Sequence, residues 1–165
     1  MKFGHFRASR AIPPILFALI AAIPELAGES RLDPSLLAAA QKAMPREMAT
    51  NHWIRALESG LWNSNRTAVA ISIPQPRASV VFVFLRQKDG TYLAADASGV
   101  ESGNFGKLGR PRTDYARFET TPVEWLHRDD GLFQVRMRTR AWRGGKRYTV
   151  SEPLVVKPDG TVLYR

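Results

Sequence analysis

The chain has no cysteine among its 165 residues, which excludes disulfide bridges and thiolate metal sites. Histidine is also scarce, and the two that follow the N-terminal segment, His52 and His127, are not at the spacing of zinc ligands. The Gly-x-Ser-x-Gly turn of serine hydrolases is missing. A glycine-rich stretch at residues 103–109 lacks the spacing of phosphate-binding loops. We therefore expect no metal and no cofactor.

Long hydrophobic runs are missing as well. The longest near the N-terminus, Ile15–Ile23, has nine residues, whereas crossing a bilayer takes about 20. Pro24 and the small residues Ala27 and Gly28 follow it, and positive residues precede it: Lys2, Arg7 and Arg10. This layout predicts a secretory signal peptide over residues 1–28, which touches a membrane only transiently.

An exported protein without disulfides is typical of the bacterial periplasm. We therefore expect the protein in the periplasm or secreted from a bacterium. The cleavage site is weak, because a cut after Ala27 places Glu25 where a small residue is usual. The alternative is a chain retained by an uncleaved N-terminal anchor.

Negative charge is in short supply. The chain has 24 Lys and Arg against 15 Asp and Glu, for a net charge of +9. The first 28 residues hold three Lys or Arg and one Glu, so the rest carries about +7. Such an excess favours an anionic partner, either an acidic protein or an envelope polymer. Nucleic acid is not expected, because export argues against it and no nucleic-acid motif is present.

Two kinds of periodicity follow in order along residues 29–165. Asp33-Pro34 has the pattern of an N-cap followed by proline in the first turn, and Pro45 ends or kinks the helix that it starts. A second helical stretch runs from about residue 46 to 59. Apolar, alternating or β-branched runs then predict strands, at residues 67–73, 79–85, 91–96, 115–120, 133–142, 146–156 and 161–164.

Helices followed by antiparallel strands predict a single α+β domain over residues 29–165. We expect one kinked helix, or two short ones, packed on a sheet of six or seven strands. Small exported domains of the cystatin-like and NTF2-like kinds share this general order. A β-sandwich with a helical arm is the alternative. The continuous apolar run at residues 79–85 predicts a central strand buried on both faces.

The segment 133–150 concentrates arginine around one tryptophan. Its alternation predicts a strand with one apolar and one polar face, and Gly144-Gly145 predicts a two-residue hairpin turn. In that register Trp142 lies opposite Arg147, on which it can stack. The polar face and a neighbouring loop supply the candidate binding residues, which are Arg136, Arg138, Arg140, Trp142, Arg147, Lys107 and Arg110.

This hairpin favours a binding or inhibitory role over catalysis, because arginine forks suit carboxylates and phosphates. A plainer interpretation is a solvated sheet face whose charge is neutralised by Glu119, Glu124 or Glu152. Two other functions stay open. One is a small hydrolase or ligand-pocket protein with a site between helix and sheet, using His52 or His127. The other is a structural component of the envelope.

Overall fold

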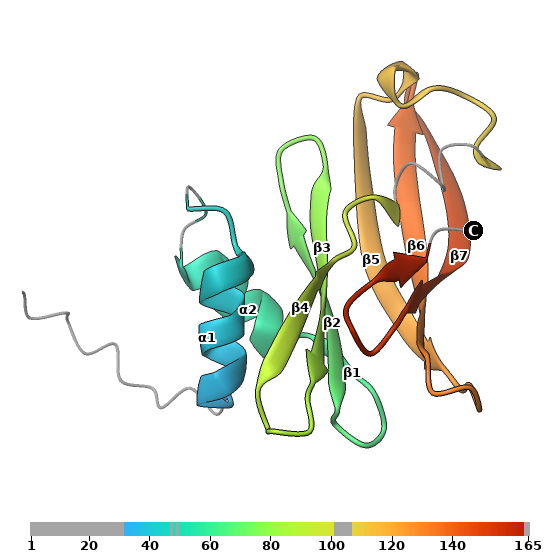
Figure 1. Cartoon of the computed structure of the whole chain (residues 1–165). Helices are drawn as coiled ribbons and strands as arrows, with labels where there is room; N and C mark the ends of the chain where they lie inside the picture. The colour runs from blue at the N-terminus through green and yellow to red at the C-terminus, as the bar shows by residue number, and fades with distance from the viewer. Residues whose placement is uncertain (1–31, 47, 49, 101–106, 164–165) are drawn as a thin grey trace, which may run out of the picture. The chain divides into compact units, whose positions relative to one another are not determined.

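The computed structural model describes residues 32–163 of the chain, apart from residues 47, 49 and 101–106. The signal peptide expected at residues 1–28 lies outside this part of the chain and stays a prediction. The described residues belong to one unit, Arg31–Arg165. Its helices and strands lie in three layers, one helical and two of β-sheet (Figure 1).

Two separate helices form the first layer. α1 (Pro34–Ala43) begins as predicted, because Asp33 Oδ1 accepts a hydrogen bond from the Ser35 backbone N–H at 2.8 Å. Hydrogen bonds from the hydroxyl and the N–H of Ser35 lower the pKa of Asp33. α2 (Thr50–Glu58) is a helix of its own, so two short helices are present rather than one kinked helix. Neither described helix has the length and apolar character needed to cross a membrane.

Sheet A, the middle layer, is antiparallel with the strand order β1-β2-β3-β4. Its strands are β1 (Leu61–Trp62), β2 (Ala68–Pro74), β3 (Ser79–Arg86) and β4 (Tyr92–Asp96). Both faces of β3 are apolar. Phe82 and Phe84 pack in the cluster formed with the helices. Val81 and Val83 belong to a second cluster on the opposite face. The prediction of a central strand buried on both faces is confirmed.

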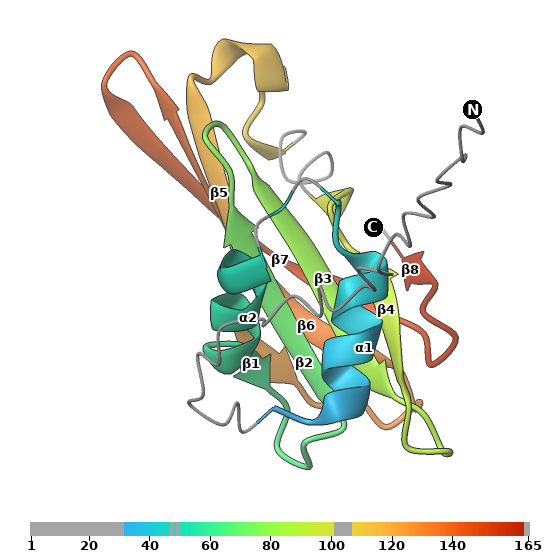
Figure 2. The same cartoon turned by 90° about the vertical axis from the view of Figure 1, so that its left-hand side faces the viewer.

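Sheet B is the third layer, antiparallel with the order β5-β6-β7-β8. Its strands are β5 (Arg117–Leu126), β6 (Phe133–Arg143), β7 (Lys146–Val156) and β8 (Val162–Leu163), and a 3-10 helix, η1 (Arg112–Asp114), precedes β5. Val135, Met137 and Leu154 share a buried cluster with Val81 and Val83 of β3, so the two sheets face each other across a common core. Figure 2 shows that the β6–β7 hairpin extends past the end of sheet A.

β5 is longer than predicted. We expected a strand that stops before Pro122, but β5 continues to Leu126. The register shifts between Pro122, which lies opposite Met137, and Glu124, which lies opposite Arg136. Val123 is the extra residue of a β-bulge. Proline is tolerated here because β5 is an edge strand of sheet B.

The expectation of one sheet with six or seven strands is not confirmed, because the strands among the described residues form two four-stranded sheets. An α+β arrangement of two helices and antiparallel sheets is present, but the general order of cystatin-like and NTF2-like domains is not confirmed. The physical reason is the burial of β3. The helices cover one of its faces, and a second sheet is needed to cover the other. The alternative of a β-sandwich with a helical arm is closer to this arrangement.

The helical layer makes a testable contribution to stability. Leu57 of α2 is fully buried in the cluster with Phe82 and Phe84. We expect Leu57→Ala to lower the free energy of unfolding by about 2–5 kcal/mol, because it removes apolar contacts and leaves a cavity. Urea denaturation monitored by circular dichroism measures this change. The exposed neighbour Glu58→Ala is the matched control. Equal losses for the two variants would contradict the burial of α2 against sheet A.

Candidate functional site

The β6–β7 hairpin has the register predicted from its sequence. Gly144 and Gly145 form its turn with φ of 55° and 76°. Both values are positive, as a type I′ turn requires, and glycine adopts them without a steric cost. Trp142 lies opposite Arg147, and the pairing continues without a shift along both strands. This regular register determines which side chains share a face.

Side chains of β6 alternate between the interior and the outer face of sheet B. Four alternate residues are fully buried, which are Val135, Met137, Thr139 and Ala141. The residues between them therefore point outward. Arg147 on β7 and Arg117 on β5 both lie opposite Trp142 and share its face. We call this surface the arginine face, and it consists of Arg117, Arg136, Arg138, Arg140, Trp142 and Arg147.

Two of these arginines are paired with acids of β5. Arg136 Nη1 lies 2.8 Å from Glu124 Oε1, and Arg117 forms an ion pair with Glu119. The guanidinium carbon of Arg117 lies 5.5 Å from the centre of the Trp142 ring, in the place where we expected Arg147. Sequence reasoning missed Arg117. The signal was its position next to the apolar Phe118 in a strand, which alternates in the same way as β6.

The other three arginines have no acidic partner in the part of the chain that the structure describes. Within the described residues, no ion pair or hydrogen bond involves the side chain of Arg138, Arg140 or Arg147. Glu119 lies opposite Arg140 in the register but bonds to Arg117. The five arginines of the arginine face outnumber the two glutamates beside them by three. Neutralisation by Glu119 and Glu124 is therefore only partial.

Lys107 and Arg110 are the two predicted contributors from the loop before β5, and Lys107 does not belong to the arginine face. Lys107 Nζ lies 2.6 Å from Glu152, which alternates with the outward residues of β7 and so lies on the opposite side of the sheet. Arg110 is exposed, and no ion pair or hydrogen bond of its side chain within the described residues places it on the arginine face. Lys107 is thus separated from the arginine face by the thickness of sheet B.

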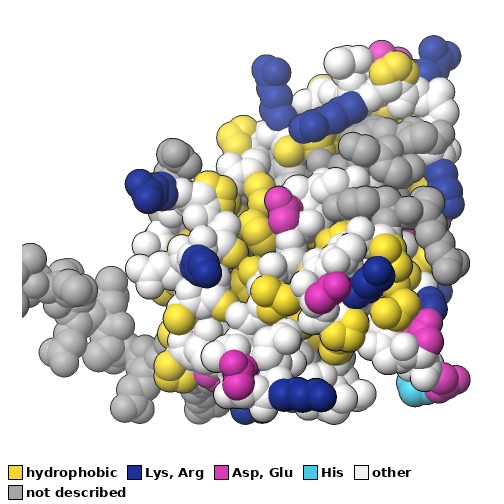
Figure 3. Space-filling model, in the orientation of Figure 1, with side chains coloured by type: hydrophobic (Ala, Val, Ile, Leu, Met, Phe, Trp, Pro, Cys, Tyr) yellow, Lys and Arg dark blue, Asp and Glu magenta, His cyan; other side chains and the backbone are white. Residues whose placement is uncertain are grey.

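Another cation, Arg143, lies at the tip of the hairpin on the inner side. The Arg143 guanidinium lies over the rings of Tyr115 and Tyr148, at 5.9 and 5.3 Å from their centres. It also donates a hydrogen bond to the Tyr148 hydroxyl at 3.3 Å, and this bond lowers the pKa of Tyr148. Figure 3 shows basic side chains gathered at this end of the molecule. The aromatic contacts of Arg143 indicate a role in holding the tip together.

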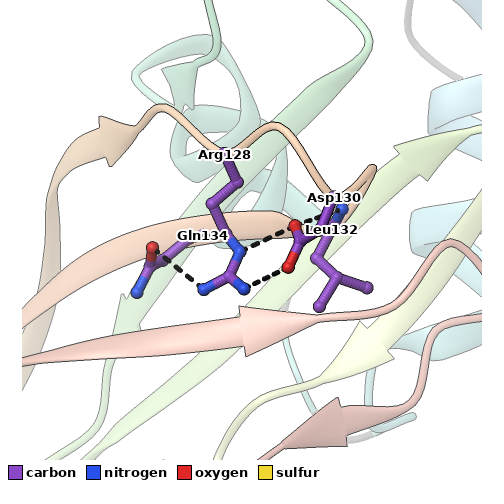
Figure 4. Close-up of polar contacts among 4 residues, drawn as sticks. All are labelled: Arg128, Asp130, Leu132 and Gln134. Atoms are coloured by element: carbon purple, nitrogen blue, oxygen red, sulfur yellow. Dashed lines mark hydrogen bonds and ion pairs between the residues drawn. The ribbon is translucent and has the colours of Figure 1, made fainter.

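The turn between β5 and β6 is stabilised by an ion pair (Figure 4). Arg128 Nε donates to Asp130 Oδ1 at 2.9 Å, and its Nη2 bonds to the other carboxylate oxygen. Arg128 Nη1 lies 3.5 Å from Gln134 Oε1, and Asp130 also accepts the N–H of Leu132. The hydrogen bonds from Arg128 lower the pKa of Asp130 to about 2. The arrangement has the character of a structural clamp.

The two candidate histidines are not enclosed. His52 is exposed on α2. His127 Nε2 lies 2.8 Å from Asp129 Oδ1, but the two side chains are 88% and 96% exposed. His127 and Glu124 line an open groove of about 630 Å³ between the β1–β2 and β5–β6 turns, not the space between helices and sheet. That space is filled by apolar side chains, including Leu36, Leu57 and Phe84.

No group of three or more acidic or histidine side chains among the described residues has the geometry of a metal site. Comparison of the chain with known protein families, characterised proteins and solved structures gives no match.

The clamp at the β5–β6 turn predicts a pH-dependent contribution to stability. The pKa of Asp130 in the folded protein, about 2, is below its ordinary value of 3.8. The carboxylate therefore stabilises the fold fully above pH 3.8, and this contribution is lost as the pH falls toward 2. We expect Asp130→Asn to lower the urea midpoint of unfolding at pH 7. On acidification, the midpoint of the variant and that of the wild type should converge.

Asp129→Asn is the matched control for this measurement, because its carboxylate contacts only an exposed histidine. It should retain the wild-type midpoint. A difference between wild type and Asp130→Asn that stays constant down to pH 2 would argue against the clamp.

Proposed function

We propose that the arginine face is a docking surface for an anionic macromolecule, and that the protein acts by binding or inhibiting this partner. The observation that supports the proposal is the set of three outward arginines, Arg138, Arg140 and Arg147, beside Trp142 and without acidic partners in the described chain. Trp142 is half-buried, and a tryptophan next to arginine on a protein surface is a composition typical of binding hot spots.

The electrostatics favour an occupied face. Outward neighbours along one strand are about 7 Å apart, so adjacent guanidinium groups repel each other by a few tenths of a kcal/mol in salt. A partner's carboxylates would remove this repulsion and form charge-assisted hydrogen bonds with the guanidinium forks. The rigid ladder between β5, β6 and β7 holds the arginine backbones in place before binding, which reduces the entropy lost on association.

We favour an acidic protein as the partner, and an anionic envelope polymer is the alternative. Export to the periplasm or the exterior is part of the proposal and rests on the layout of residues 1–28. A hydrolase or ligand-pocket protein is less well supported, because the space between helices and sheet is filled and both histidines are exposed. A purely structural envelope component would not need a row of unneutralised arginines.

Charge reversal tests the proposal directly. Immobilised polyglutamate serves as the anionic probe, and polyphosphate serves as the polymer probe. We expect Arg138→Glu with Arg140→Glu to weaken polyglutamate binding by about 100-fold or more, because each charge-assisted hydrogen bond is worth about 1.5–3 kcal/mol. Binding is measured as the dissociation constant at fixed salt, since ionic strength screens the interaction.

Lys42→Glu with Arg55→Glu is the control, because it changes the net charge equally on the exposed surfaces of α1 and α2. It should leave binding within a few-fold of wild type. If both double variants lose affinity equally, only net charge matters and the docking surface is refuted. Tight binding of polyphosphate without binding of polyglutamate would favour the envelope polymer.

A further inference from the structure

The backbone of β7 presents an open edge beside the arginine face. Arg143 and Lys146 flank the two-residue turn and form its closing hydrogen-bonded pair. Hydrogen-bonded and non-hydrogen-bonded pairs alternate from there along an antiparallel ladder. The carbonyl of Trp142 accepts a hydrogen bond from Ala116 on the β5 side at 2.9 Å, as this alternation requires. The backbone groups of every second β7 residue therefore point away from β6.

The outward-pointing groups belong to Arg147, Thr149 and Ser151. β8 pairs with only the last two residues of β7, so it leaves these three uncovered. Within the described chain no hydrogen bond reaches their N–H or C=O groups. The backbone of Pro153 also points away from β6, so the N–H that proline lacks removes no hydrogen bond from the β6–β7 ladder. With respect to the described residues, β7 thus has a long edge whose backbone donors and acceptors are available.

The opposite edge of sheet B differs, because side chains and backbone of sheet A cover it. The Phe118 N–H donates to the Arg77 carbonyl at 3.2 Å. The Thr120 N–H donates to Ser79 Oγ at 3.3 Å, and the Thr120 carbonyl accepts a hydrogen bond from the Ser72 hydroxyl. The bulge of β5 lies just beyond these contacts. Among the described residues, the part of β7 before β8 is therefore the longer uncovered edge of sheet B.

The side chains along the β7 edge are short enough for the arginines of β6 in the arginine face to extend to that edge. Thr149 lies opposite Arg140, and Ser151 lies opposite Arg138. Both are short and exposed, so an arginine of β6 can extend across them. A strand added to β7 would lie about 9.5 Å from β6, twice the spacing between neighbouring strands. A glutamate on that strand can meet an arginine that crosses the intervening short side chain.

We propose that β7 receives an extended acidic segment of the partner protein as an additional strand of sheet B. This inference rests on the proposed function and specifies how the partner binds. Backbone hydrogen bonds to Arg147, Thr149 and Ser151 provide the attachment, as in other cases of strand addition. Alternate side chains of the segment lie on the outer face at the same repeat of about 7 Å as Arg138 and Arg140, so acids at every second position match the arginine row.

The test uses a synthetic peptide of about eight residues in which glutamate alternates with valine, a typical strand length. The matched probe has the same sequence with N-methyl groups on alternate backbone nitrogens, which keeps the charges and removes the donors. We expect the methylated peptide to bind the full chain at least about tenfold more weakly, because one or two hydrogen bonds are lost. Isothermal titration calorimetry measures both dissociation constants.

A substitution in the protein, instead of in the peptide, tests the same backbone hydrogen bonds. Thr149→Pro removes one outward N–H without removing a bond to β6, whereas Thr149→Val keeps that N–H. We expect the proline variant to bind the unmethylated peptide at least about tenfold more weakly and the valine variant to bind it normally. If Thr149→Pro fails to fold, as judged by circular dichroism, the two peptides on the unaltered chain still decide the question.

The outcomes separate this inference from the proposed function. Equal binding of both peptides, lost in both cases by Arg138→Glu with Arg140→Glu, would overturn strand addition and leave the arginine face as a purely electrostatic surface. No binding of either peptide would overturn strand addition, and the polyglutamate and polyphosphate measurements would then decide the proposed function separately. Sedimentation that shows a dimer of the chain, dissociated by Thr149→Pro, would also overturn the inference, because a second copy would then occupy the edge.

Discussion

Burial of β3 on both faces is the constraint on which the arrangement of the layers depends. Its phenylalanines face α1 and α2, and its valines face sheet B. Apolar burial contributes about 25 cal/mol per Å², so leaving either face open to water would be costly in a chain of this size. The helices alone cover one side. Sheet B therefore has to turn one face inward, and its other face is left to water and to charged residues.

The polarity of the arginine face follows from that division. Because Val135 and Met137 are buried in the interior and side chains alternate along a strand, Arg136 and Arg138 point outward. The hairpin then carries this pattern beyond the end of sheet A, where the inner side is covered by Tyr115, Tyr148 and the loop before β5. A long, regular hairpin thus combines a buried base with a charged outer surface and one uncovered edge.

Local features were predictable from the sequence because they depend on nearby residues. The N-cap at Asp33, the turn at Gly144-Gly145 and the alternation of β6 each follow from side chains within a few positions. The division into two sheets was not predictable, because it depends on which distant strands share a core.

The same limit applies to the site. Its arginines on β6 and β7 could be assigned to one face from alternation alone. The contributions of β5 could not, because β5 and β6 are joined by a longer connection without a tight-turn signal that fixes the register, and their pairing includes an irregularity at Pro122. The contacts of a loop with a distant strand are equally hard to predict. The sequence therefore grouped Lys107 and Arg110 with the arginine face, although Lys107 contacts Glu152 on the other side of the sheet.

The extra residue in β5 has a consequence for how this part of the chain tolerates change. Before Val123 the odd-numbered residues of β5 point to solvent, and after it the even-numbered ones do. The bulge therefore reverses the alternation of inward and outward side chains along β5. As a result, Glu124 points toward Arg136, and Trp125 contacts Phe133. Loss of that single residue would exchange the two environments, with a carboxylate driven inward and an indole left in water. At position 123, deletion of the residue should therefore be more damaging than its substitution by another amino acid.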